Sequence, residues 1–219
     1  MRIINSNITL FREKLYQWYD RNGRHFPWRD KSVNNYQKIV SELLLQRTKA
    51  ETVAKFYPTF IQKFPNWKTV SNCSINDLEG VLKPIGLYKQ RAMRLHSFAK
   101  EMTKRNGRIP HGKEELEKMP MVGQYIANAT MSLVYDKPYP LLDVNMARVL
   151  ERFFGKRKLV DIRYDPYIQE LAHKVIAVKN SKVLNWAILD FAAIVCKART
   201  PNCQACLLNV KCTFYKKRS

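Results

Sequence analysis

The stretch LEKMPMVGQYIA, residues 116–127, decides the fold. Its apolar spacing and its Pro-Met-Val-Gly centre predict a short helix, a tight turn and a second helix. Backbone N–H groups that precede the N-terminus of a helix form a site for an anion such as a phosphate. The segment therefore indicates an all-α region that presents an anion site.

Helical periodicity also dominates the chain outside this stretch. Ile8, Phe11, Leu15 and Trp18 recur at three- and four-residue spacing, which is typical of an amphipathic helix ending at Asn22-Gly23. No stretch alternates with a period of two, so we predict an all-α protein with about ten short helices. Further helices are expected at 36–48, 52–64, 74–82, 88–105, 113–118, 124–135, 144–154, 165–178 and 182–196, with a loop at 25–29.

An acidic residue follows an apolar run in PLLDVN, residues 140–145. Asp143 directly precedes a predicted helix, and aspartate is a favoured N-cap residue. On periodicity alone, a plain N-cap is the favoured interpretation of Asp143.

Four cysteines lie within seventeen residues in the pattern C-x6-C-x2-C-x5-C: Cys196, Cys203, Cys206 and Cys212. Four thiolates can hold a [4Fe–4S] cluster or a structural zinc ion. Zinc usually takes two short cysteine pairs, and this spacing contains only one, so it favours the cluster. Disulfides are the third alternative, but residues 1–10 lack the apolar segment of a secretory signal. Cys73 lies far upstream and is interpreted as an ordinary small residue.

The charge balance indicates a polyanionic partner. Lys and Arg total 39 and Asp and Glu total 18, a formal net charge of +21 over 219 residues. Nucleic acid is the first candidate and an anionic membrane surface the second. A lysine-rich surface kept for solubility is the simplest alternative. Because no apolar run approaches the length of a membrane span, we expect no membrane partner.

These motifs together resemble the endonuclease III, or helix-hairpin-helix, superfamily of DNA glycosylases. The hairpin is followed by an L-D-x-N segment and then by the four cysteines, and the resemblance covers nearly the whole chain. FPWR at 26–29, SELLLQRT at 41–48 and NWAILDF at 185–191 are most similar to MutY-type adenine glycosylases and archaeal G·T-mismatch thymine glycosylases.

The resemblance implies two helical domains of the endonuclease III type. A central domain, residues 23–133, would contain the hairpin. A second domain, residues 1–22 plus 134–219, would contain a C-terminal [4Fe–4S] loop held by the four cysteines. The active site would lie in the cleft between these domains.

Three catalytic residues are implied by the resemblance. Asp143 matches the catalytic aspartate, which would stabilise positive charge on the sugar as the glycosidic bond breaks. Tyr125 stands where bifunctional members carry a Schiff-base lysine, so little or no AP lyase activity is expected. Glu42 matches an acidic residue that faces the extruded base. The simpler alternatives are a core-packed tyrosine and a solvated surface glutamate.

Six residues are expected to contact DNA. Gln46 and Leu87 match side chains that enter the duplex beside a flipped nucleotide, although a loop leucine is also easily a minor core residue. The others would meet the DNA backbone from the hairpin and from a basic loop that the cluster holds. These six residues are Gln46, Leu87, Val122, Gly123, Lys197 and Arg199.

Two departures from the family pattern lie in the hairpin. Met121 replaces the usual first glycine, and its side chain disfavours a positive φ. Ile126 replaces the usual threonine. The chain as given also ends seven residues after Cys212, without the C-terminal domain usual in MutY-type enzymes.

The sequence therefore predicts a monofunctional DNA glycosylase of base excision repair that removes thymine and uracil mispaired with guanine. We expect a monomer that acts on double-stranded DNA in the cytoplasm or nucleoid of a prokaryotic-type cell. The alternatives are a MutY-like adenine glycosylase, acting opposite 8-oxoguanine or G, and a non-catalytic iron–sulfur DNA-binding protein.

Overall fold

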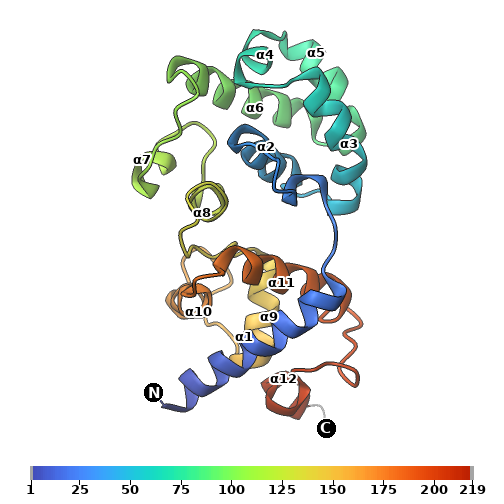
Figure 1. Cartoon of the computed structure of the whole chain (residues 1–219), viewed down its shortest axis with the longest axis vertical. Helices are drawn as coiled ribbons and strands as arrows, with labels where there is room; N and C mark the ends of the chain where they lie inside the picture. Colours follow the sequence, from blue (N-terminus) through green and yellow to red (C-terminus); the bar gives the residue numbers. More distant parts are fainter. Residues whose placement is uncertain (1, 218–219) are drawn as a thin grey trace. The chain divides into compact units, whose positions relative to one another are not determined.

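The structure is a computed structural model that describes residues 2–217, with side chains described from Ser6 onward (Figure 1). All regular elements in this range are α- or 3-10 helices, which confirms the all-α prediction. By its backbone contacts the chain separates into two compact units. One unit is His25–Tyr135. The other combines the residues up to Arg24 with those from Asp136 onward. The expected functional domains, 23–133 and 1–22 plus 134–219, stay a prediction.

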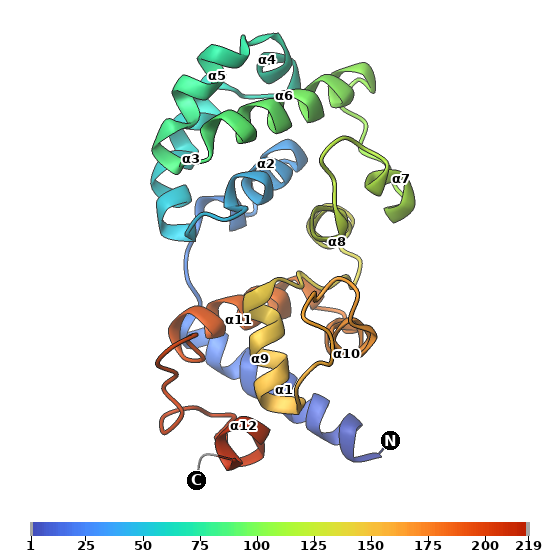
Figure 2. The same ribbon diagram turned by 180° about the vertical axis from the view of Figure 1, so that it is seen from behind.

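Within residues 2–24 and 136–217, the discontinuous unit is built from five α-helices and one 3-10 turn. Helix α1 packs against α11, and α9 packs against α10, α11 and α12 (Figures 1 and 2). Its core is aromatic: Phe11 stacks at a tilt on Phe153, with centroids 5.1 Å apart, and Trp18 meets Phe191 edge-on. The elements are α1 (Arg2–Asn22), α9 (Val144–Phe154), α10 (Pro166–Ile176), α11 (Ser181–Ile194), η3 (Asn209–Lys211) and α12 (Thr213–Lys216).

One buried ion pair anchors the end of α1 in this unit. The Asp190 carboxylate is fully buried, and it accepts hydrogen bonds from both the backbone N–H and the Nε–H of Arg24 at 2.8 Å. Because an unpaired buried charge is costly, removing either partner would destabilise the junction that follows α1.

The continuous unit holds the remaining elements. Helix α6 packs against α4 and α5, α2 packs against α3 and α8, and α7 packs against α8. Tyr36, Trp67 and Phe98 form an aromatic chain through its core. The elements are η1 (Pro27–Arg29), α2 (Asn35–Leu45), α3 (Ala50–Lys63), α4 (Trp67–Asn72), α5 (Ile75–Leu82), η2 (Lys83–Ile85), α6 (Tyr88–Lys104), α7 (Lys113–Glu117) and α8 (Gln124–Leu133).

The structure corrects several predicted boundaries. Helix α2 ends at Leu45 rather than at Thr48, because Gln46 has a non-helical ψ of 116° and Arg47 then adopts a positive φ of 57°. The predicted loop at 25–29 contains the 3-10 turn η1. Helix α4 was not predicted, although a reciprocal capping box between Asn66 and Thr69 marks its start. Helix α12 was not predicted either.

Candidate functional site

The hairpin joins α7 to α8 through a turn that contains a residue in the left-handed conformation. Met121 adopts a φ of 67° despite its side chain, which is 40% exposed. Met119 and Val122 are buried, and the Val122 N–H donates to the Met119 carbonyl oxygen. A Cβ added to the exposed Gly123 would meet no atom within 4 Å. Gly123, rather than the Val122 side chain, is therefore the exposed part of this turn.

Glu42 and Tyr125 are joined within the continuous unit. Glu42 lies on α2, is only 5% exposed, and accepts a hydrogen bond of 2.9 Å from the Tyr125 hydroxyl on α8. A solvated surface glutamate is therefore excluded. Because α2 and α8 pack directly against each other, the helix pair holds the phenol and the carboxylate together.

Gln46 and Leu87 lie in two loops of the same unit. Gln46 is the C-cap residue of α2 and is partly exposed. Leu87 is 50% exposed and has a φ of 50°, so it is not a core residue. An exposed leucine in a left-handed conformation costs both solvation and backbone strain. This combination is typical of a residue kept for contact with a ligand.

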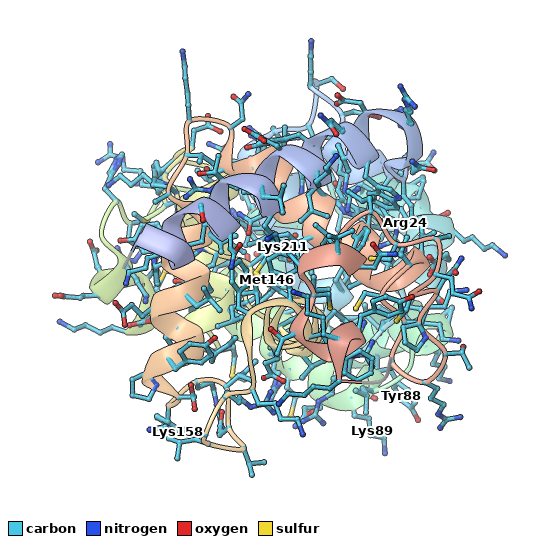
Figure 3. The ribbon with its side chains drawn as sticks, turned by 90° about the horizontal axis from the view of Figure 1, so that it is seen from below. Arg24, Tyr88, Lys89, Met146, Lys158 and Lys211 are labelled. Atoms are coloured by element: carbon cyan, nitrogen blue, oxygen red, sulfur yellow. The ribbon has the colours of Figure 1, made fainter. Side chains whose placement is uncertain are left out.

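Asp143 is the N-cap of α9, as its position in the sequence indicates. Its Oδ1 accepts hydrogen bonds from the backbone N–H groups of Asn145 and Met146, at 2.9 and 2.8 Å. Its Oδ2 accepts one from the Asn145 side-chain amide at 2.6 Å. The side chain of Met146, which follows this cap, is fully buried. Met146 is labelled in Figure 3, where the exposed Lys158 lies at the edge of the view.

The electrostatic environment of Asp143 contains opposing effects. Burial raises the pKa of this carboxyl above its ordinary value. The hydrogen bonds from Met146 and Asn145, and the nearby Arg148 cation, favour the charged form and limit the rise. Asp143 is therefore a partly desolvated carboxylate with a fixed orientation, as stabilisation of a developing cation requires.

A chain of hydrogen bonds leads from Asp143 to the cysteine segment. The Arg148 guanidinium donates to Asn145 Oδ1, to the Cys196 carbonyl and to the Ala192 carbonyl, each at 3.0 Å. Sequence reasoning missed Asn145 and Arg148 as site residues. The three-residue spacing between Asn145 and Arg148 was an available signal, since residues at that spacing share one face of a helix.

Arg152 holds the cysteine segment one turn further along α9. Its guanidinium donates to the carbonyls of Lys197 and Ala198 at 2.7 and 2.8 Å, and it lies 4.7 Å from the centre of the Phe214 ring. The side chains of Lys197 and Arg199 are exposed. The basic loop therefore has a fixed backbone while its cationic side chains face solvent.

The four cysteines surround one pocket. Cys196, Cys203, Cys206 and Cys212 all line one small pocket that is partly open to solvent. All four are free thiols, and among residues 2–217 no group of three or more His, Cys, Asp or Glu side chains is placed to hold a single metal ion. In a [4Fe–4S] cluster each thiolate binds a different iron, so the ligands surround a volume instead of converging on a point. Four thiols that line one pocket are therefore suited in number and kind to ligate such a cluster.

Burial also governs the chemistry of these thiols. Burial, together with the charges of the other three cysteines, raises the pKa of Cys206 to about 11. Burial raises the pKa of Cys212 as well. A cationic metal centre offsets both effects, because its ligands bind as thiolates and release their protons.

Comparisons with known proteins agree with this geometry. Residues 40–163 match the HhH-GPD superfamily of base excision DNA repair proteins. The chain is 34% identical to the thymine/uracil-DNA glycosylase of Pyrobaculum aerophilum, covering 97% of this chain and 94% of that relative. It is 30% identical to the adenine DNA glycosylase of Buchnera aphidicola subsp. Schizaphis graminum, covering 97% of this chain but only 61% of that relative. The solved structure of a thermostable thymine-DNA glycosylase matches 97% of this chain with a TM-score of 0.90 and 29% identity.

Structures of endonuclease III with DNA match more distantly. The non-covalent complex has a TM-score of 0.84 at 22% identity, a likeness that supports the fold alone. The helical architecture, the hairpin and the match over 40–163 define the class of protein. The chain belongs to the HhH-GPD superfamily of base excision DNA repair proteins, and similarity over nearly its full length relates it to the thymine/uracil-DNA glycosylases.

Proposed function

We propose that the chain is a monofunctional DNA glycosylase that removes thymine, and uracil, mispaired with guanine in double-stranded DNA. The observation that carries this proposal is similarity over nearly the whole chain to relatives named thymine/uracil-DNA glycosylases. The Tyr125–Glu42 pair and the oriented carboxylate of Asp143 support it, because they supply groups for the base and for the sugar respectively.

Hydrolysis of the glycosidic bond develops an oxocarbenium-like sugar. In our proposal the Asp143 carboxylate stabilises this charge and orients the attacking water. Three hydrogen bonds hold the carboxylate before substrate arrives, so little reorganisation accompanies the reaction. Glu42 accepts an N–H from the extruded base or supports its departure, with its orientation maintained by the Tyr125 hydroxyl.

Tyr125 is also the basis for assigning little or no AP lyase activity. A lyase of this superfamily needs a lysine amine that forms an imine with the sugar, and a phenol cannot form one. Water is therefore the nucleophile, and the product is an intact strand with an abasic site.

DNA contact is assigned to three surfaces. Gln46 and Leu87 enter the duplex as the nucleotide leaves the stack, which offsets part of the few kcal/mol that extrusion costs. The hairpin binds a backbone phosphate at Gly123, and Lys197 and Arg199 add cationic contacts. We propose that the protein acts as a monomer on chromosomal DNA in the cytoplasm or nucleoid.

We further propose that Cys196, Cys203, Cys206 and Cys212 hold a [4Fe–4S] cluster, since all four line one pocket. Bound there, the cluster would cross-link the C-terminal segment and supply no step of the hydrolysis. The chain's own contribution is to present Lys197 and Arg199 on a rigid loop. Iron and sulfide analysis with visible absorbance would detect the cluster, whereas stoichiometric zinc would refute this assignment.

The decisive experiment is a panel of duplexes that each contain one G·T, G·U, A·8-oxoguanine or A·G pair. We expect base release from G·T and G·U. Release only from the adenine-containing pairs would favour the MutY-like alternative, for which the Buchnera relative is the supporting observation. Binding without any release would favour a non-catalytic DNA-binding protein.

A further inference from the structure

One buried arginine lies between the two loops that carry Gln46 and Leu87. Arg91, on the first turn of α6, is only 7% exposed. Burial lowers the pKa of its guanidinium below the usual arginine value, so its surroundings must offset the cost of a desolvated cation. The proposed DNA contacts do not use this residue.

The Arg91 side chain donates hydrogen bonds to both loops, and its two Nη atoms bind the end of α2 and the loop that follows it. Nη1 donates to the carbonyls of Leu43 and Leu44, which lie in the last turn of α2, at 2.9 Å each. Nη2 donates to the Gln46 carbonyl at 3.0 Å and to Thr48 Oγ1 at 2.8 Å.

The remaining donor and the backbone complete this connection. Nε donates to the Gly86 carbonyl at 3.4 Å, while the bond of 2.9 Å from the Arg91 backbone N–H to the Leu87 carbonyl is the first backbone hydrogen bond of α6. The Thr48 hydroxyl in turn donates to the Ile85 carbonyl at 3.3 Å. With these bonds each of the three guanidinium nitrogens has a partner, and the second loop is tied to the first.

Both loops contain strained backbone beside the residues expected to enter DNA. Arg47 has a φ of 57°, Leu87 has a φ of 50°, and Gly86 has a φ of 71°. Conformations of this kind persist only where surrounding contacts over-determine them. Lysine carries no planar fork and cannot make the same set of bonds, so an Arg→Lys change at this position is not conservative.

From these contacts we infer that Arg91 is a positioning residue that holds Gln46 and Leu87 in one rigid arrangement for insertion into the DNA duplex. This inference rests on the proposed function, because it assigns those two side chains to base extrusion. It also explains why a cation is buried at the C-terminus of α2, where the helix dipole and the unpaired carbonyls favour positive charge.

The test is a double-mutant cycle in single-turnover excision from a G·T duplex. Arg91→Lys should slow excision about tenfold or more in the wild-type background, the scale of a lost charged hydrogen bond. In a Gln46→Ala/Leu87→Ala background the same change should slow it less than about threefold, because residues that act through one another are not additive. Arg94→Lys, an exposed change on the same helix, is the matched control and should leave the rate unchanged.

An equal loss in both backgrounds would overturn the inference, because it would mean that Arg91 only stabilises the fold. Thermal melting and active-site titration measure that structural contribution separately. If Arg91→Lys does not fold, Thr48→Val removes only the hydroxyl between Arg91 and Ile85 and enters the same cycle.

A separate measurement distinguishes failure of the proposed function from failure of the positioning role. If wild type releases no base, a fluorescent base analogue beside the mismatch still reports unstacking upon binding. The increase in fluorescence should then be lost in Arg91→Lys. Unchanged fluorescence in that variant would refute the positioning role independently of catalysis.

Discussion

Asn145→Ala tests how the Asp143 carboxylate, for which we propose a catalytic role, is held in place. The variant removes the side-chain amide that donates to Asp143 Oδ2 at 2.6 Å, while the two backbone N–H bonds to Oδ1 remain. It also removes the acceptor for Arg148, so it disconnects Asp143 from the cysteine segment. Asn145 is not expected to touch the base, so the effect should appear in the chemical step.

The magnitude follows from one hydrogen bond to a charged group, which contributes about 1.5–3 kcal/mol. If that energy is lost from the transition state, the single-turnover rate falls roughly 10- to 150-fold. The pH dependence gives a second readout. The Asn145 side chain lowers the pKa of Asp143, so its removal raises a pKa that burial has already raised.

The sign of the pH effect is definite. Asp143 must be ionised to stabilise a cation, so activity is lost as pH falls through its folded-state pKa. Raising that pKa moves the acid limb of the rate profile to higher pH in Asn145→Ala. The assay is single-turnover excision from a G·T duplex across the acid range, with the exposed Asn76→Ala as control. A rate within about threefold of wild type and an unmoved acid limb would refute the reasoning.

Three further predictions follow from the same contacts. Asp143→Asn should abolish excision but keep mismatch binding, because asparagine is an equally good N-cap and its oxygen can still accept the backbone N–H groups of Asn145 and Met146. Residual excision near the wild-type rate would contradict this. Tyr125→Lys should allow borohydride trapping on abasic DNA, which wild type should not show; trapping of wild type would contradict the monofunctional assignment. Arg152→Met should weaken DNA binding and make it less salt-dependent, because the loop that carries Lys197 loses the two hydrogen bonds that Arg152 donates to its carbonyl groups. Unchanged affinity and salt slope would show that this loop does not contact DNA.

Most helices were predictable because their signals are local. The side chains of Asp143, Asp165 and Ser74 each accept backbone hydrogen bonds as N-caps, at the starts of three helices that the sequence predicts. Among the described residues, no helix is long and apolar enough to span a membrane. The missed helix α4 is short, and its amphipathic pattern covers only Trp67 and Val70, too few residues for periodicity to detect.

The sequence by itself predicted the helical class and the family, and both are confirmed. It also singled out the four cysteines, Asp143 and Glu42 as site residues, and their roles stay a prediction. These depend on spacing and residue type, which the linear chain carries. Only the tertiary structure decided that Glu42 is buried against Tyr125 and that Asn145 and Arg148 connect Asp143 to Cys196. It also decided that Arg91 joins two loops, one of which lies more than forty positions away from it in the sequence. The physical reason is that a hydrogen bond depends on where folding brings a donor and an acceptor together, and sequence separation does not encode that distance.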